Sequence, residues 1–237
     1  MVWRNYWDAL LELVFPGSHL CYFCWRKIGE QKVRGVCDSC CAKILQLGRA
    51  RSVGPLDKVV SIVPYEGIYR EMIAELKYSG RAELVKPLGY LIARKIKAAG
   101  LARKSSVLIP VPLHPVREAE RGFNQSSLLA REIAGQLGLC CEEAILKRVH
   151  YNANQARLGK RERICNIKGA FAVERTQSDK IAGKSVILID DIITTGATLT
   201  ACAEALQSCK AGSIIAFTWA AGVPSEKQVL QSKIIFE

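Results

Sequence analysis

Long apolar runs are missing from this sequence of 237 residues. The N-terminal stretch WRNYWDALLELVFPG holds many apolar residues, but Arg4, Asp8 and Glu12 interrupt it. It therefore lacks the apolar core of a secretory signal and is too polar to span a bilayer. No other apolar run approaches spanning length. These absences exclude a secreted or an integral membrane protein, and we expect a cytoplasmic protein with no membrane span.

Acidic residues are few compared with basic ones. The sequence has 22 Asp and Glu against 34 Lys and Arg, which gives a formal net charge of +12. Such an excess favours anionic partners, for example phosphates or nucleic acid, although a basic surface also serves solubility alone. Internal repeats and low-complexity tracts are absent too, and 49% hydrophobic with 24% charged residues is typical of a folded protein. The composition therefore excludes an intrinsically disordered chain.

The sequence holds ten cysteines. Without a secretion signal they do not predict disulfides, because the cytosol is reducing. Four of them form two C-x-x-C pairs, Cys21 with Cys24 and Cys37 with Cys40, which are separated by 12 residues. Each pair places two thiolates on one side of a tight turn, and two such turns supply the ligands of a tetrahedral zinc ion. A redox role needs a thioredoxin-like βαβ setting, which these pairs lack, so we expect structural zinc.

Basic and aromatic residues surround the four cysteines. This mixture suits single-stranded nucleic acid, in which bases stack on rings and phosphates pair with cations. The rings are equally suited to forming the small core of the module itself. The residues concerned are Tyr22, Phe23, Trp25, Arg26, Lys27, Lys32, Arg34 and Lys43.

After residue 52 the pattern changes to alternating strand and helix signals. Apolar, β-branched runs predict strands at residues 59–63, 107–111, 144–149, 170–173, 186–189 and 213–219. Apolar residues at helical spacing predict helices at residues 68–76, 87–100, 128–137 and 199–210, while the polar stretch 112–124 is expected to be a loop. The alternation predicts an α/β fold, a parallel sheet with helices on both faces and with ligands at the carboxyl ends of its strands. We divide the chain into an N-terminal helix and zinc module, residues 1–52, and an α/β domain, residues 53–237.

The stretch VILIDDIITTGAT, residues 186–198, carries the chemistry. Four apolar residues form a buried strand that delivers Asp190 and Asp191 at its carboxyl end. Backbone N–H groups and threonine hydroxyls at the following helix start form an anion cradle, which Gly196 lets a phosphate approach closely. The carboxylates then accept hydrogen bonds from vicinal ribose hydroxyls, so that one element recognises a sugar 5-phosphate. The candidate ligand-binding residues are Asp190, Asp191, Thr194, Thr195, Gly196, Ala197 and Thr198.

This stretch resembles the phosphoribosyl pyrophosphate motif of type I phosphoribosyltransferases along its whole length. Two further segments, PVPLH at residues 110–114 and RGFNQ at residues 121–125, resemble the corresponding region of ComF proteins. Together with the cysteine module, the resemblance to the ComF family covers nearly the entire chain. It implies a type I phosphoribosyltransferase-like sheet preceded by a zinc ribbon.

The segment from residue 147 to residue 168 has seven Lys or Arg and one acid, Glu162. It resembles the flexible catalytic loop of the family, which implies that its cations close over the pyrophosphate and stabilise the charge that develops as it leaves. A solvated basic loop and a nucleic-acid contact are the alternatives. The catalytic candidates are Arg157, Lys160 and Arg161, and His114, Arg117 and Arg121 are expected to face the same group from the preceding loop.

The resemblance implies that pyrophosphate is displaced from the anomeric carbon of the ribose, with Mg²⁺ bridging the pyrophosphate and the ribose hydroxyls. It also implies a role in natural competence and DNA uptake, with single-stranded DNA and DNA-uptake proteins as partners. The alternative is a non-catalytic single-stranded DNA-binding or adaptor protein that uses phosphoribosyl pyrophosphate only as a ligand. The sequence does not identify an acceptor. Because Met1 is not followed by cysteine, transfer from glutamine is disfavoured.

Overall fold

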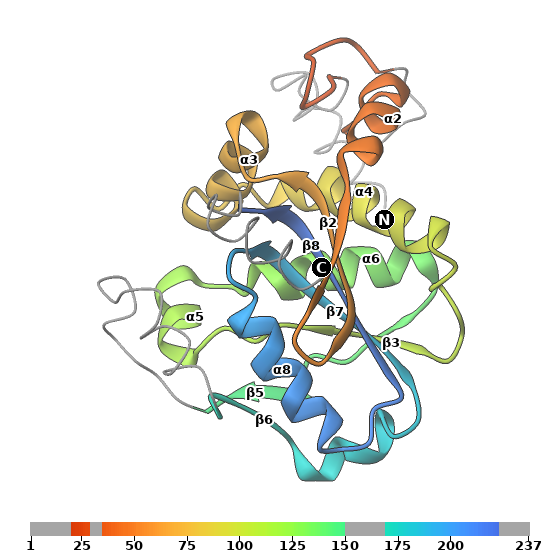
Figure 1. Ribbon diagram of the computed structural model, residues 1–237. Coiled ribbons are helices and arrows are strands. Elements are labelled where there is room, and N and C mark those ends of the chain that lie inside the picture. The colour runs from red at the N-terminus through yellow and green to blue at the C-terminus, as the bar shows by residue number, and fades with distance from the viewer. Residues whose placement is uncertain (1–19, 29–34, 150–168, 223–237) are drawn as a thin grey trace, which may run out of the picture.

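A single six-stranded sheet forms the centre of the computed structural model, which describes residues 20–28, 35–149 and 169–222 (Figure 1). The strand order is β1-β2-β8-β7-β3-β4. Only the β1–β2 pair is antiparallel, and the four other pairs are parallel. The strands are β1 (Arg49–Val53), β2 (Leu56–Pro64), β3 (Ser106–Pro110), β4 (Cys140–Cys141), β7 (Ser185–Ile193) and β8 (Ser213–Ala221).

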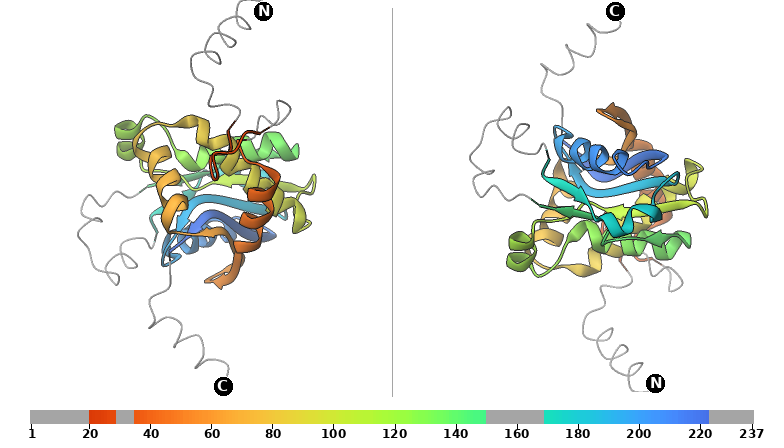
Figure 2. Two further views of the ribbon diagram at one scale, coloured as in Figure 1. Left: turned by 90° about the horizontal axis from the view of Figure 1, so that it is seen from above. Right: turned by 90° about the horizontal axis from the view of Figure 1, so that it is seen from below.

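Helices cover both faces of this sheet. In Figure 2 the blue helix α8 lies on one side, and the yellow and green helices α4 and α6 lie on the other. A short antiparallel pair, β5 (Leu146–Arg148) and β6 (Phe171–Val173), packs on the α8 side. The helices are α2 (Asp38–Leu47), α3 (Gly67–Tyr78), α4 (Val85–Ala98), α5 (Pro115–Arg121), α6 (Gln125–Leu137) and α8 (Ala197–Gln207), with 3₁₀ turns η2 (Ala82–Leu84) and η3 (Arg175–Lys180). The predicted fold class is therefore confirmed.

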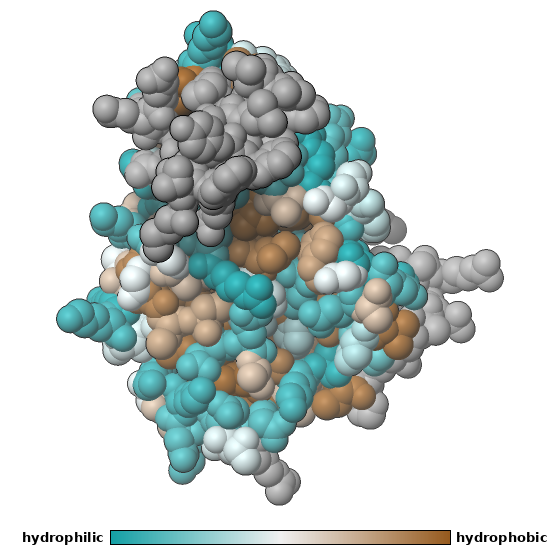
Figure 3. Space-filling model, turned by 180° about the vertical axis from the view of Figure 1, so that it is seen from behind, coloured by the Kyte–Doolittle hydropathy of each residue, from teal (hydrophilic) through white to brown (hydrophobic). Residues whose placement is uncertain are grey.

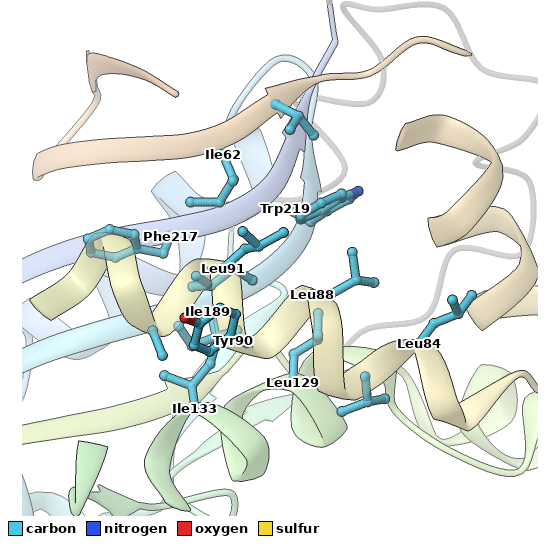
Figure 4. Packing of buried hydrophobic residues seen from close by; sticks show 14 of the residues in the cluster. Ile62, Leu84, Leu88, Tyr90, Leu91, Leu129, Ile133, Ile189, Phe217 and Trp219 are labelled. Atoms are coloured by element: carbon cyan, nitrogen blue, oxygen red, sulfur yellow. The ribbon is translucent and has the colours of Figure 1, made fainter. Parts of the chain in front are cut away.

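The apolar run of β7 shows why the sheet needs cover on both faces. Ile187 and Ile189 belong to the core under α4 and α6, whereas Val186 and Leu188 belong to the core under α8. Side chains alternate between faces along a strand, so a strand that is apolar at every position is buried on both. Figure 4 shows the α4 side, where Phe217 and Trp219 of β8 face Leu88 and Leu91 of α4.

Strand β1 was missed by the sequence prediction. Arg49–Val53 pairs with β2 and crosses the predicted division between residues 52 and 53. All its positions are exposed or half-buried, and it lacks the apolar run that identified the central strands. The cysteine module also shares the core of the α/β domain, because Cys21, Val36 and Ile44 belong to the cluster of buried residues under α4.

Helix α5 replaces the loop that was expected at residues 112–124. His114 Nδ1 accepts a hydrogen bond from the backbone N–H of Val116 at 3.2 Å, and Pro115 occupies the first turn. Gly122 ends the helix, and its N–H bonds to the carbonyl of Glu118. Helix α5 has no buried residue and therefore no apolar stripe. These capping interactions are enough to form the helix without one.

The surface is largely hydrophilic where it can be seen. From behind, hydrophilic residues surround several apolar patches, the largest near the middle of the upper half (Figure 3). Among the described residues, no helix is long and apolar enough to cross a membrane.

Candidate functional site

Strand β7 delivers the two motif carboxylates at its carboxyl end. It is longer than the sequence predicted and continues through Asp190 and Asp191 to Ile193. It pairs with β8 on one side and with β3 on the other. The carboxylates are therefore placed by a central strand whose preceding four residues are fully buried.

The loop after β7 brings the motif glycine against β1. Gly196 has φ +88°, and a Cβ at this position would lie 2.5 Å from Cγ1 of Val53. Only glycine fits such a left-handed, closely packed position without strain. Gly196 is also the N-cap of α8, where Thr195 Oγ1 accepts from the N–H of Ala197 at 3.3 Å. The start of α8 therefore presents backbone N–H groups beside threonine hydroxyls, as an anion cradle requires.

Asp191 is buried and held from two directions. Lys77 Nζ of α3 lies 2.8 Å from Asp191 Oδ2, with the side chains 16% and 6% exposed. Gln125 Nε2, at the start of α6, donates to the same oxygen at 2.5 Å. Arg121 Nη1 in turn donates to Gln125 Oε1. These bonds connect α3, α5 and α6 to the carboxyl end of β7.

Among the described residues, Asp190 has no such cation in direct contact. Its Oδ1 accepts from Ser126 Oγ at 3.1 Å and from the N–H of Asp191 at 2.9 Å. Burial, followed by the charge of Asp191, raises the pKa of Asp190 to about 7, with the more distant Lys77 charge opposing the rise. The pair thus divides into one carboxylate neutralised by lysine and one that titrates near neutrality.

Arg51 of β1 reaches the same loop. Its Nη2 donates to the carbonyl of Thr194 at 3.1 Å, while its buried Nε has no hydrogen-bond partner within the described structure. Burial lowers the pKa of Arg51. A half-buried guanidinium with an unused donor beside an anion cradle fits an anionic ligand there.

A hollow of about 480 Å³ adjoins this site between the end of α3 and helix α5. Lys77 and Arg121 line it, and both also reach Asp191, directly or through Gln125. Arg117, on its rim, pairs with Glu120 at 3.2 Å. The hollow is therefore basic and connected to the carboxylates by side-chain contacts.

The four predicted zinc ligands lie together. The Sγ atoms of Cys21, Cys24, Cys37 and Cys40 all lie within 4.8 Å of one another. The 3.7 Å between Cys24 and Cys37 matches the spacing of about 3.8 Å that tetrahedral Zn–S bonds of about 2.3 Å impose. The N–H of Cys40 donates to Cys37 Sγ at 3.4 Å and lowers the pKa of that thiol to about 7, while burial raises the pKa of Cys40. This cluster could hold one metal ion.

Comparison with known proteins agrees with the geometry. The family model of the phosphoribosyl transferase domain matches residues 124–234. Competence protein F of Haemophilus influenzae is 30% identical over 64% of this chain and 67% of its own. Competence protein ComFC of Bacillus subtilis is 29% identical over 90% of this chain and 88% of its own. The DNA utilization protein YhgH of Salmonella typhi is 29% identical over 84% and 89%.

The chain belongs to the ComF family. The family model begins at Asn124, the residue that caps α6. It therefore covers both carboxylates and the β7–α8 loop. It does not cover the cysteine cluster, helix α3 with Lys77 or helix α5 with Arg121. The family model thus leaves the first half of the sequence unmatched.

The structure brings some of the predicted site residues together. The motif residues from Asp190 to Thr198 form one strand-loop-helix unit, and Arg121 joins it through Gln125. His114 caps α5, and Arg117 pairs with Glu120 on the same helix. The catalytic candidates Arg157, Lys160 and Arg161 lie outside the described residues.

Sequence reasoning did not select Lys77, Arg51, Gln125 or Ser126 as site residues. Gln125 belonged to a recognised segment, RGFNQ, and that was the signal by which it could have been found. Lys77 stands at the end of an amphipathic helix, where a lysine is ordinarily solvated, and Arg51 stands on an edge strand. Their roles depend on contacts between distant parts of the sequence.

Proposed function

We propose that this chain binds phosphoribosyl pyrophosphate together with Mg²⁺ and acts as a phosphoribosyltransferase in DNA uptake. The carboxyl end of β7 is the observation that carries the proposal. It combines two adjacent carboxylates with a helix start whose N-cap, the left-handed Gly196, packs tightly against β1. The names of the relatives, a competence protein and a DNA utilization protein, supply the biological setting.

In this proposal the loop at residues 194–198 takes the 5-phosphate, and Asp190 and Asp191 accept hydrogen bonds from the ribose hydroxyls. Mg²⁺ would be held with the ligand beside Asp190 and Asp191 and would neutralise negative charge on the pyrophosphate. The bond from the anomeric carbon to the pyrophosphate oxygen breaks, its electron pair leaves with the pyrophosphate, and an acceptor lone pair forms the new bond. Arg157, Lys160, Arg161, His114, Arg117 and Arg121 are the proposed partners of the leaving group.

Zinc in the four-cysteine cluster belongs to the same proposal. Four cysteines leave a zinc ion no open position, so that zinc would stabilise the fold of the module and take no part in the transfer. We retain residues 1–52 as the zinc module and residues 53–237 as the phosphoribosyltransferase-like domain, with β1 joining the two.

Calorimetric titration of magnesium phosphoribosyl pyrophosphate into the wild type and Asp190→Asn tests the binding. Asp179→Asn is the matched control, because Asp179 is an exposed carboxylate on η3. We expect binding by the wild type and the control and a loss of at least about tenfold in Asp190→Asn. A folded wild type that binds no ligand would refute the proposal, and equal binding by Asp190→Asn would refute the assigned role.

Single-stranded DNA binding is the second candidate function. The net charge of +12 favours it, and so does the name of the DNA utilization relative. Neutralising phosphates releases counterions, so affinity for an oligonucleotide should fall steeply as salt rises. Affinity that is weak at low salt or independent of salt would exclude this function.

A further inference from the structure

The hollow between α3 and α5 contains an exposed aromatic ring. Tyr78, the last residue of α3, is 79% exposed, the highest exposure among the large hydrophobic residues of the described structure. The guanidinium carbon of Arg121 lies 5.5 Å from the centroid of its ring. Arg121 is itself held by Gln125. The ring is thus backed by a fixed cation on one side and remains open to solvent.

The charges around the ring favour an anion. Lys77, Arg117 and Arg121 line the hollow, and Glu120 is the one carboxylate among its described lining residues. Lys77 is already paired with Asp191, but Arg117 is paired only across the surface of α5, with both side chains about half exposed. Such an exposed pair contributes little stability. Arg117 can therefore exchange Glu120 for a phosphate at low cost.

We propose that this hollow binds a nucleotide unit of single-stranded DNA, whose base stacks on Tyr78 and whose phosphate pairs with Arg117. The proposal deepens the DNA-binding function above and rests on it for the source of the nucleotide. Stacking on a solvent-open ring needs an unpaired base, which single strands offer and duplexes do not. A free nucleotide shares the same chemistry. Because Lys77 contacts Asp191 and Arg121 reaches it through Gln125, the nucleotide would lie next to the candidate sugar-phosphate site and would compete with its pyrophosphate for Arg117.

Fluorescence anisotropy with labelled hexathymidylate tests the site. Tyr78→Ala should weaken binding at least about fivefold, the loss expected for one base–aromatic stack, and Tyr78→Phe should retain it. Trp25→Ala tests the alternative location at the cysteine module, since Trp25 is 66% exposed beside that cluster. Arg117→Gln should lower the slope of log affinity against log salt by about 0.7, whereas Arg103→Gln, at an exposed arginine in the loop before β3, should not.

The possible results distinguish an error in the location of the DNA site from an error in the DNA-binding function itself. If wild type binds hexathymidylate but Tyr78→Ala binds equally well, the hollow is the wrong site. A loss in Trp25→Ala alone would assign the DNA to the cysteine module instead. If the wild type does not bind hexathymidylate, the DNA-binding function and this proposal both fail, independently of calorimetry with phosphoribosyl pyrophosphate. Competition by thymidine monophosphate as effective as that by unlabelled hexathymidylate would show that the occupant is a free nucleotide, which overturns the DNA strand as its source.

Discussion

At the carboxyl end of β7 the candidate ligand groups stand on a strand with neighbours on both sides, whereas the four cysteines stand on short local elements. β7 pairs with β3 and β8, and the four residues before Asp190 are fully buried. Cys21 and Cys24 lie on a turn closed by a hydrogen bond from the N–H of Trp25 to the carbonyl of Cys21 at 2.8 Å. Cys37 caps α2, and Cys40 lies in its first turn.

The difference lies in what holds each set of ligands in place. The core of the α/β domain positions the carboxylates before any ligand arrives, and it also bears the cost of burying them. In the proposed zinc site the cysteines would depend on one another and on the metal, because a small module has little core of its own. The module nevertheless gains support from the domain, since Phe23 packs against Tyr69 and Trp219 with ring centroids 6.2 and 6.3 Å apart. Loss of metal should therefore affect the two regions very unequally.

Cys21→Ser has the largest expected effect. Structural zinc supplies on the order of 10 kcal/mol to a small module, so loss of a buried ligand should release the metal and unfold residues around it. Metal analysis should find about one zinc per chain in the wild type and in Cys209→Ser, which alters a cysteine outside the cluster, and none in Cys21→Ser. Binding of magnesium phosphoribosyl pyrophosphate should persist. Its loss would show that the two regions are not independent, and wild type without zinc would refute the metal site.

Lys77→Met tests the buried ion pair that supports the carboxylates. Removing the lysine leaves Asp191 buried without its cation, which should cost about 3–5 kcal/mol of unfolding free energy. Lys180→Met removes a lysine from the exposed pair with Glu142, 2.9 Å apart, and should cost about 1 kcal/mol or less. Denaturant unfolding measures both. The double variant Lys77→Met/Asp191→Asn should recover part of the loss, and additive effects would show that the pair is not coupled.

Gly196→Ala tests the close approach of the loop to β1. Alanine in a left-handed conformation costs about 1–2 kcal/mol, and here its Cβ would also lie 2.5 Å from Val53 Cγ1. Gly138→Ala isolates the backbone cost, because Gly138 has φ +66° and nothing within 4 Å of the added atom. We expect the larger loss of stability in Gly196→Ala, with partial recovery on adding Val53→Ala. Equal losses of stability in both glycine variants would mean that β1 moves away from the added methyl group at no energetic cost.

Much of the fold could be predicted because its signals are local. The unbroken apolar run at residues 186–189 identified a strand buried on both faces, and the structure places β7 there. The predicted strand at residues 59–63 falls within β2, and the helix predicted at residues 87–100 begins two residues earlier, at Val85. Pro87 is tolerated there because the first turn of a helix needs no N–H donors. β1 and α5 were missed because neither has an apolar stripe.

The candidate site was predictable only where one segment supplies it. The residues from Asp190 to Thr198 are contiguous, and so the motif could be seen. The partners of the carboxylates come from far away in sequence: Gln125 is 66 positions from Asp191, and Arg51 is 143 positions from Thr194. Lys77 reaches Asp191 from α3, on the opposite half of the chain. Such pairings are fixed by tertiary packing, and no local pattern records them.

The smallest expected effect concerns pH and Asp190. Its pKa is raised to about 7, so the protonated form prevails below pH 7 and the carboxylate above it. Between pH 6 and pH 8 the ionised fraction rises about tenfold, and affinity for magnesium phosphoribosyl pyrophosphate should rise with it by up to about tenfold, or about 1.4 kcal/mol. The phosphates of the ligand also titrate, near pH 6, and this contributes to the pH dependence of the affinity. The variant Asp190→Asn retains the contribution of the ligand and lacks that of the carboxylate, so the difference between the two proteins isolates Asp190. Identical pH profiles for the two proteins would mean that Asp190 is already ionised at pH 6 or does not contact the ligand. A steeper wild-type profile would show that the fold's cost of burying this charge is recovered when the ligand binds.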